Sequence, residues 1–275
     1  MASRSMSQRA GGDWSLERVA RGLTHRAKGI VAKRPGSARF CVVCGESSAD
    51  FGPYRGGWSF APALVREVGY VAGDYDDCYC TKCSSTDRER HLQLYISALE
   101  LLDDLQDTRV VHFAPELHTR TLIKNANPRE YIMCDVSPKS DEIRQMDLLD
   151  LDFPDDSVGL FIVNHVLEHV PNTKKALSEI HRVLQPQGLV IIQTPFCLGL
   201  VSTWEDAGID SEAARYQAFG QEDHVRLFGM DLFDQLLNAG FSYRGGSHAE
   251  LLPNLDAWRN GVDPREPFFL YAKGD

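Results

Sequence analysis

The fold of this chain follows from one stretch, RVVHFAPELHTRTLI, at residues 109–123. Its first five residues form a short apolar run, which is typical of a buried strand. Ala114-Pro115-Glu116 interrupts the run, and residues 117–123 continue in a pattern that a helix can adopt. The next apolar run, 131–134, ends at Asp135, which lies 19 positions after Glu116. An acid at about this separation, roughly 20 residues, receives the ribose hydroxyls in doubly wound folds that bind nucleosides. The stretch therefore predicts half of a βαβ unit with a nucleoside site.

The same alternation of strands and helices continues toward the carboxyl end of the chain. The expected strands are 158–163, 188–194, 241–243 and 268–272, and the expected helices are 173–184 and 232–239. Asn164 and His165 directly follow the first of these strands. They stand at its carboxyl end, where open α/β sheets bind their ligands. Their position therefore indicates a functional site.

Four segments of this region carry a family resemblance. They are VVHFAPE at 110–116, the run from Asp147 through FPDDS at 153–157, NHVLEHV at 164–170 and RVLQPQG at 182–188. Together they resemble class I S-adenosylmethionine (SAM)-dependent methyltransferases. The resemblance implies an α/β fold with a Rossmann-like seven-stranded sheet and helices on both faces. The first segment departs from the family pattern, because His112, Ala114 and Glu116 stand where an acid and glycines are usual. SAM has no phosphate for glycines to accommodate, so fewer of them are needed.

The resemblance also implies where SAM binds. Asp135 is expected to accept both ribose hydroxyls, and Asp147 with its adjacent backbone to hold the adenine amino group. Judged from the residues alone, Asp147 is equally well a solvated acid in a turn. The expected cofactor-binding residues are Phe113, Ala114, Glu116, Asp135, Val136, Asp147, Leu148, Asn164 and His165.

Two histidines are candidates for a catalytic general base. His165 lies at the strand end beside the expected methyl group, and His224 ends a long irregular, acidic segment at 196–222 that we interpret as a lid. A neutral imidazole near pH 7 suits proton removal from an acceptor. Alignment of donor and acceptor without any base is the alternative. Glu168 and His169 are interpreted instead as helix-start residues that satisfy backbone groups.

Two C-x-x-C pairs, Cys41 with Cys44 and Cys80 with Cys83, predict a structural zinc site. Four thiolates leave no open position for water or substrate, so this zinc is expected to stabilise a small module. The loop between the pairs contains Phe51, Tyr54, Trp58, Phe60 and Tyr70 among glycines and prolines, which predicts an aromatic-backed β module. Cys78 breaks the pair spacing and is expected to be a spectator.

A helix is expected over residues 84–105, with Thr86 and Glu89 as a capping box at its start. The segment from Cys80 to His91 resembles a bacterial subgroup of methyltransferases with an N-terminal zinc-binding segment. The expected organisation is a basic arm at 1–39 with one amphipathic helix, a zinc module at 40–92 and a methyltransferase domain at 93–275. The arm is interpreted as a helix that packs on the acidic body; a targeting peptide and an RNA-binding arm are the alternatives.

Charge and composition limit the function classes. The net charge is −10, and residues 1–40 carry +7, which leaves −17 on the rest of the chain. An acidic body repels phosphate backbones, which argues against a nucleic-acid substrate. The sequence has no apolar run long enough for a membrane span and no apolar leader, and its seven cysteines are odd in number. These features predict reduced thiols and a cytoplasmic location.

The leading prediction is an enzyme that transfers the SAM methyl group to an oxygen or nitrogen of a small metabolite or a carrier-tethered intermediate. An RNA methyltransferase with an N-terminal zinc module is the first alternative. The second is a non-catalytic SAM-binding or scaffold protein, which the altered first segment would suit.

Overall fold

The computed structural model describes residues 38–274. The strands are β1 Arg39–Phe40, β2 Ser47–Ser48, β3 Tyr70–Val71, β4 Arg109–Phe113, β5 Glu130–Asp135, β6 Arg144–Gln145, β7 Val158–Val163, β8 Leu184–Ile191, β9 Phe196–Cys197, β10 Trp204–Glu205, β11 Arg226–Leu227, β12 Phe241–Tyr243 and β13 Leu270–Lys273. The helices are η2 Trp58–Phe60, α2 Ala63–Glu67, α3 Asp87–Ala98, α4 Leu117–Asn125, α5 Thr173–Val183, α6 Glu212–Phe219, α7 Leu232–Asn238, α8 His248–Leu251 and α9 Ala257–Asn260. The expected helix of the basic arm lies outside the described residues.

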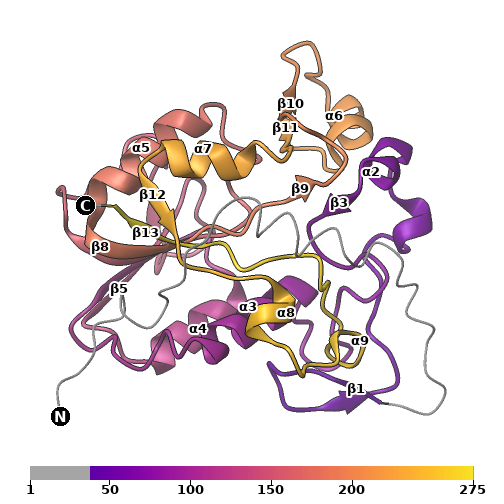
Figure 1. Cartoon of the computed structure of the whole chain (residues 1–275), viewed down its shortest axis with the longest axis horizontal. Helices are drawn as coiled ribbons and strands as arrows, with labels where there is room; N and C mark the ends of the chain where they lie inside the picture. The colour runs from indigo at the N-terminus through magenta and orange to yellow at the C-terminus, as the bar shows by residue number, and fades with distance from the viewer. Residues whose placement is uncertain (1–37, 275) are drawn as a thin grey trace.

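Seven strands form one sheet in the order β12-β13-β8-β7-β4-β5-β6. The strands from β8 to β6 are parallel, and β13 and β12 are antiparallel to their neighbours. Helices α3 and α4 cover one face of the sheet, and α5 and α7 cover the other (Figure 1). This arrangement confirms the predicted fold class. Because β4, β5 and β7 are parallel and in register, Phe113, Cys134 and Val163 lie level at one edge of the sheet.

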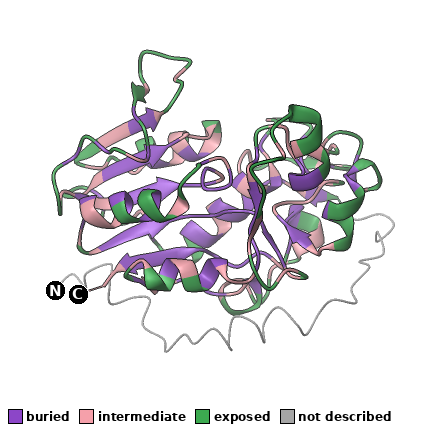
Figure 2. Cartoon of the chain, turned by 90° about the horizontal axis from the view of Figure 1, so that it is seen from above, coloured by how far each residue is buried: buried purple, intermediate pink, exposed green. Residues whose placement is uncertain are grey.

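Strand β4 shows why these residues form a buried strand. Val110 packs in the core beneath α3 and α4, and the next residue, Val111, packs in the core beneath α5 and α7. Side chains alternate between faces along a strand, so a sheet covered on both faces needs a continuous apolar run. The sheet is accordingly buried through its centre (Figure 2). No helix within residues 38–274 is long and apolar enough to cross a membrane.

Several element bounds differ from those predicted. The strand expected at 188–194 runs from Leu184 to Ile191, because it pairs from its first residue with Val158. The helix expected over 84–105 is shorter, Asp87–Ala98, but it begins with the predicted capping box of Thr86 and Glu89. The predicted boundary at residue 92 therefore lies inside this helix. The segment at 196–222 is less irregular than expected, since it contains β9, β10 and α6.

The cysteine-bearing segment is joined to the rest of the chain by a short antiparallel pair. Strand β3 pairs with β9, and Tyr70 lies opposite Cys197. Three loop aromatics, Trp58, Tyr70 and Tyr75, pack here with Phe219 of α6. The loop aromatics therefore do not form one backing layer as the predicted β module would require, since Phe51 packs separately against Cys41 and Cys80. Their apolar partners come from residues far along the chain, which spacing between cysteines does not reveal.

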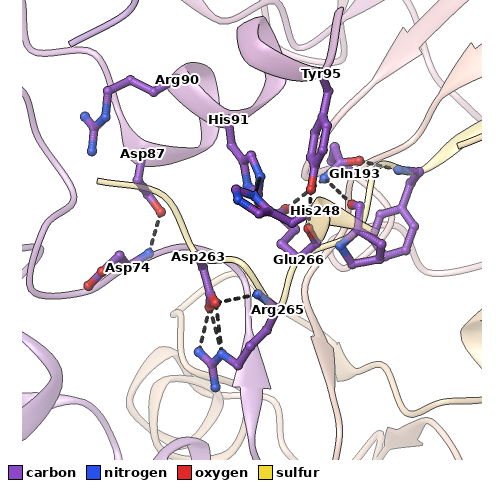
Figure 3. A network of polar contacts seen from close by, with 12 residues as sticks. Asp74, Asp87, Arg90, His91, Tyr95, Gln193, His248, Asp263, Arg265 and Glu266 are labelled. Carbon is purple, nitrogen blue, oxygen red and sulfur yellow. Dashed lines mark hydrogen bonds and ion pairs between the residues drawn. The ribbon is translucent and has the colours of Figure 1, made fainter. Parts of the chain in front are cut away.

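A buried polar network joins α3 to the segments that follow β8 and precede β13 (Figure 3). His91 Nε2 lies 2.9 Å from Nδ1 of His248, and His91 Nδ1 lies 3.4 Å from Oε2 of Glu266. Gln193 donates to Glu266 Oε1 at 2.9 Å, and Tyr95 donates its hydroxyl to the Glu266 carbonyl at 2.6 Å. Each of these side chains has partners, so the network fixes the base of α3 against the residues before β13.

Candidate functional site

A cavity of about 360 Å³ opens at the carboxyl edge of the sheet, where a nucleoside site was predicted. One wall comes from the turns after β4 and β7. The opposite wall comes from the cysteine-bearing segment and the start of α3. The lining residues are Cys83, Ser84, Thr86, Arg88, Glu89, Ala114, Glu116, Leu117, His118, Asn164 and His165. The two parts of the chain that the sequence separated into domains therefore share one cavity.

The turn after β4 keeps a glycine-like backbone without a glycine. Ala114 has φ +50°, in the left-handed region that L-residues rarely adopt. His112 is fully buried, with Nδ1 2.8 Å from the Tyr131 hydroxyl and Nε2 2.7 Å from Oε2 of Glu116. Burial opposes ionisation of Glu116, but the contact with His112 holds its pKa below the usual value. The departure from the family pattern thus places a carboxylate, aligned by a buried histidine, in the cavity wall.

The turn after β7 is fixed from both sides. The side-chain oxygen of Asn164 accepts from the Gln193 amide at 3.1 Å, and the His165 amide donates to the Gln193 carbonyl at 2.7 Å. His165 has φ +54°, in the left-handed region, and its side chain lines the cavity. Asn164 Nδ2 is buried and has no partner among the described residues. An unpaired donor beside a cavity is suited to a ligand acceptor.

The remaining predicted SAM residues lie along the same edge but do not line this cavity. Asp135 and Val136 end β5, and one Asp135 oxygen accepts from the Ser137 amide at 2.8 Å. Asp147 is exposed and accepts from the Leu149 amide at 2.8 Å, the geometry of a turn acid. Leu148 is buried in the core. Phe113, the fifth residue of β4, is likewise buried in the core beneath α5 and α7.

Sequence reasoning missed the wall that α3 contributes. Glu89 Oε2 accepts from the Thr86 amide at 2.9 Å, and its Oε1 accepts from the His118 amide at 3.0 Å. It therefore caps α3 and the start of α4 together. Arg88 lines the cavity, and the charges of Asp87 and Glu168 raise its pKa although burial opposes them. The residues of this wall all come from the segment Cys80 to His91, which resembles the zinc-bearing subgroup.

A second group of titratable side chains lies behind His165. His165 Nδ1 is 3.7 Å, and His224 Nε2 4.0 Å, from Oε1 of Glu168. The interpretation of Glu168 as a residue that satisfies backbone groups is wrong, because its side chain accepts from the Thr194 hydroxyl at 3.1 Å. Residues 167–169 form a turn and not a helix start. His224 is fully buried and does not line the cavity.

The four predicted zinc ligands come together in the structure. Cys41 Sγ lies 3.8 Å from Cys83 Sγ, and Cys44 Sγ lies 3.9 Å from Cys80 Sγ. Zn–S bonds of about 2.3 Å in a tetrahedron place sulfurs about 3.8 Å apart, so the donor set fits zinc. Burial raises the pKa of Cys80, but the amides of Cys83 and Lys82 outweigh it and lower this pKa to about 7. Cys78 lies outside the cluster, as predicted.

Comparison with known proteins identifies the class. Residues 98–192 match the family model described as a methyltransferase domain. This match spans β4 to β8, the strands that form the cavity edge and its neighbours. The protein is therefore a methyltransferase enzyme with the class I fold, and SAM is the methyl donor of that class. No curated protein matches the chain.

Solved structures with the same fold are distant in sequence. The YcgJ protein from Bacillus subtilis is 14% identical, with a TM-score of 0.41, and the match covers 66% of this chain and 94% of that chain. A putative methyltransferase in a complex with the Haloferax volcanii Trm112 activator is 16% identical, with a TM-score of 0.42 and coverage of 69% and 94%. The Burkholderia thailandensis 1,6-didemethyltoxoflavin-N1-methyltransferase is 15% identical, with a TM-score of 0.41 and coverage of 68% and 87%.

Proposed function

We propose that this enzyme transfers the methyl group of SAM to an oxygen or nitrogen atom of a small or carrier-tethered acceptor. The observation that supports this proposal is the cavity at the sheet edge, lined by Asn164, His165 and the turn after β4. Its volume of about 360 Å³ is within the usual range for small-molecule sites. The acidic body disfavours a nucleic-acid substrate, because like charges repel.

In this proposal Asp135 accepts the ribose hydroxyls of SAM. It ends the strand beside β4, and only one of its carboxylate oxygens is used by the local turn. Loss of this charged acceptor should weaken SAM binding by at least about tenfold, or about 1.4 kcal/mol. Titration calorimetry with SAM and the Asp135→Ala variant measures this loss. The matched control is Asp141→Ala, an exposed acid in the following loop, which should bind SAM normally. Unchanged affinity of the Asp135 variant would reject the assignment.

His165 is the histidine that we propose as general base, because it lines the cavity and His224 does not. Once the acceptor is identified, kcat of His165→Ala with saturating SAM should be about a hundredfold or more below that of the wild type. The acidic limb of its pH profile should disappear as well, which loss of alignment alone would not cause. A variant with near-normal kcat and an unchanged profile would show that alignment suffices.

We propose that Cys41, Cys44, Cys80 and Cys83 hold one structural zinc ion, as the zinc-bearing methyltransferase subgroup would imply. Elemental analysis of protein purified without chelator should find about one zinc per chain on these thiolates. The Cys41→Ser/Cys80→Ser variant should lose this zinc, and its N-terminal module should unfold before the sheet does. Cys78→Ala is the control and should keep its zinc. Zinc that stays bound in the double variant would contradict the proposal.

A further inference from the structure

We infer that Glu168, His169 and His224 form a second metal site, for a divalent cation, behind the wall of the SAM cavity. Each residue contributes one ligand atom, and these three atoms all lie within 4.8 Å of one another. Bonds of about 2.0–2.2 Å to a small cation place neighbouring nitrogen and oxygen ligands roughly 3 to 4 Å apart. Within this group, Glu168 Oε1 lies 4.0 Å from Nε2 of His224.

The buried atoms of this group lack protein partners. Glu168 is 1% exposed and His224 is fully buried, yet Glu168 Oε1 and His224 Nε2 make no hydrogen bond within residues 38–274. His165 Nδ1, on the cavity side, is also buried without a partner. Buried polar atoms are nearly always paired, and an unpaired carboxylate oxygen is especially costly. Both nitrogens lie near Glu168 Oε1, at 3.7 and 4.0 Å, without a hydrogen bond to it, so these unpaired atoms indicate a missing ligand.

The hydrogen bonds at the back of each imidazole select the metal-binding form. His224 Nδ1 lies 3.1 Å from the Phe219 carbonyl, and His169 Nδ1 lies 3.2 Å from the Asp223 carbonyl. A carbonyl can only accept, so each Nδ1 carries the proton and each Nε2 keeps its lone pair. A histidine that binds a metal through one ring nitrogen usually donates its other ring N–H to a backbone carbonyl or a carboxylate.

Glu168 is held in an equivalent way. The Thr194 hydroxyl donates to Oε2 at 3.1 Å, so Oε1 is the oxygen that faces the histidines. The Val225 amide donates to the Glu168 carbonyl at 3.0 Å, and Arg226 donates to the Leu167 carbonyl at 2.8 Å. These bonds fasten the segment with His224 to the turn with Glu168 and His169. The ligand positions are therefore set by backbone contacts in addition to their own side chains.

The charge balance also calls for a cation. Among residues 38–274, no lysine or arginine forms an ion pair with Glu168, and its only charged-group neighbours within 4.0 Å are His165 and His224. A metal ion would neutralise the carboxylate and satisfy the two Nε2 lone pairs at once. Imidazole and carboxylate ligands suit manganese, iron, cobalt or zinc, whereas the four thiolates select zinc. A buried water molecule is the competing occupant, because it could donate to the same atoms.

None of the three ligands lines the cavity, so a metal here would act on the acceptor through His165. His165 stands between this site and the cavity, since it lines the cavity and its Nδ1 lies 3.7 Å from Glu168 Oε1. This last step rests on the proposed function, and it favours an oxygen acceptor. An acceptor hydroxyl in the cavity would lose its proton to His165, and its oxygen would form the bond to the SAM methyl carbon. The carbon–sulfur bond would break, and its electron pair would stay on sulfur to give a neutral thioether.

Manganese binding to the full-length protein tests the site without any acceptor. Electron paramagnetic resonance of added Mn²⁺ reports free ion, and the thiolate cluster disfavours this metal. Wild type should bind one Mn²⁺ per chain, and Glu168→Gln and His224→Gln should bind it at least about a hundredfold more weakly. His169→Gln alters a side chain that is 32% exposed, so it tests the same site with little risk to folding. His181→Gln, on α5, is the matched control and should bind Mn²⁺ like wild type.

Two outcomes would overturn the inference. One is a wild type that binds neither Mn²⁺ nor Co²⁺ outside the cysteine cluster, which would assign the position to water. The other is equal Mn²⁺ binding in wild type and the Glu168→Gln and His169→Gln variants. Co²⁺ bound at nitrogen and oxygen lacks the thiolate charge-transfer absorption, so the two metal sites are told apart by their spectra. Calorimetry with SAM on the same samples tests the proposed function separately.

Discussion

Two buried groups of histidine and glutamate lie in this molecule, and they differ in whether their polar atoms are paired. In the first, His91, His248 and Glu266 are linked to one another and to Gln193 (Figure 3). In the second, Glu168 and His224 face each other at 4.0 Å without a hydrogen bond. Both groups use the same residue types at similar depth. Composition alone therefore does not separate a structural network from a ligand site, whereas the partner of each polar atom does.

The largest effect should come from breaking the paired network. Glu266→Ala removes the acceptor of Gln193 and a partner of His91, both buried. Unpaired buried groups cost about 1–3 kcal/mol each, so the variant should lose about 3 kcal/mol of unfolding free energy. Urea denaturation measures this loss. Glu142→Ala, an exposed acid in a surface ion pair, is the control and should leave the stability almost unchanged. A Glu266 variant as stable as this control would remove the basis of the comparison.

A pH-dependent effect of comparable size is expected at Asp87, on the network side. Burial raises the pKa of this carboxyl to about 7, although Arg88 and the Asp74 amide act against the rise. The folded-state pKa exceeds the unfolded value of about 3.8, so folding favours the neutral acid. The stability that Asp87 contributes is complete below about pH 3.8 and is lost as pH rises through 7. The loss is about 1.4 kcal/mol for each unit of pKa difference.

The difference in unfolding free energy between wild type and Asp87→Asn isolates this contribution. The asparagine does not titrate, so the wild type should become less stable relative to the variant as pH rises from about 4 to 7. A difference that stays constant over this range would show that Asp87 ionises normally in the folded protein.

The smallest effect should come from the unpaired group in the absence of added metal. Glu168→Gln replaces a buried carboxylate, whose Oε1 makes no hydrogen bond within residues 38–274, with a neutral amide of similar shape. With no manganese added, its unfolding free energy should change by less than about 1 kcal/mol. At Mn²⁺ concentrations about 100 times its Kd, wild type should gain about 2.7 kcal/mol and the variant nothing. Equal stabilisation of both proteins by Mn²⁺ would contradict this expectation.

The sequence predicted the sheet well, because its signals are local. The runs at 109–113 and 158–163 were predicted with their observed bounds, since strands buried on both faces read as continuous apolar stretches. The cysteine pairs were predicted for the same reason, as their spacing lies within a few residues. The wall that α3 gives to the cavity was not predicted. Arg88 reaches that wall only because the chain folds back over the strand ends, which no local pattern encodes.

The role of Glu168 shows a second reason why the sequence did not predict the whole site. Glu168 and His169 are adjacent in sequence, and a helix start was a reasonable interpretation of such a pair. Their relation to His224 depends on β11 and the preceding turn lying beside residues 167–171, where Arg226 holds the carbonyls. Whether a polar atom is paired is a property of the folded molecule. The sequence could name the candidate histidines, but it could not show which of their nitrogens lacks a partner.

The pairing of β3 with β9 has a consequence for synthesis on the ribosome. Tyr70 and Val71 leave the exit tunnel long before Phe196 and Cys197, their only strand partners within residues 38–274, have been translated. Until then the edge of β3 and the apolar side chains around it are open to other chains. Contacts between residues so far apart also form slowly. The N-terminal half of this enzyme should therefore depend on chaperones during translation, and a fragment that stops before residue 196 should aggregate.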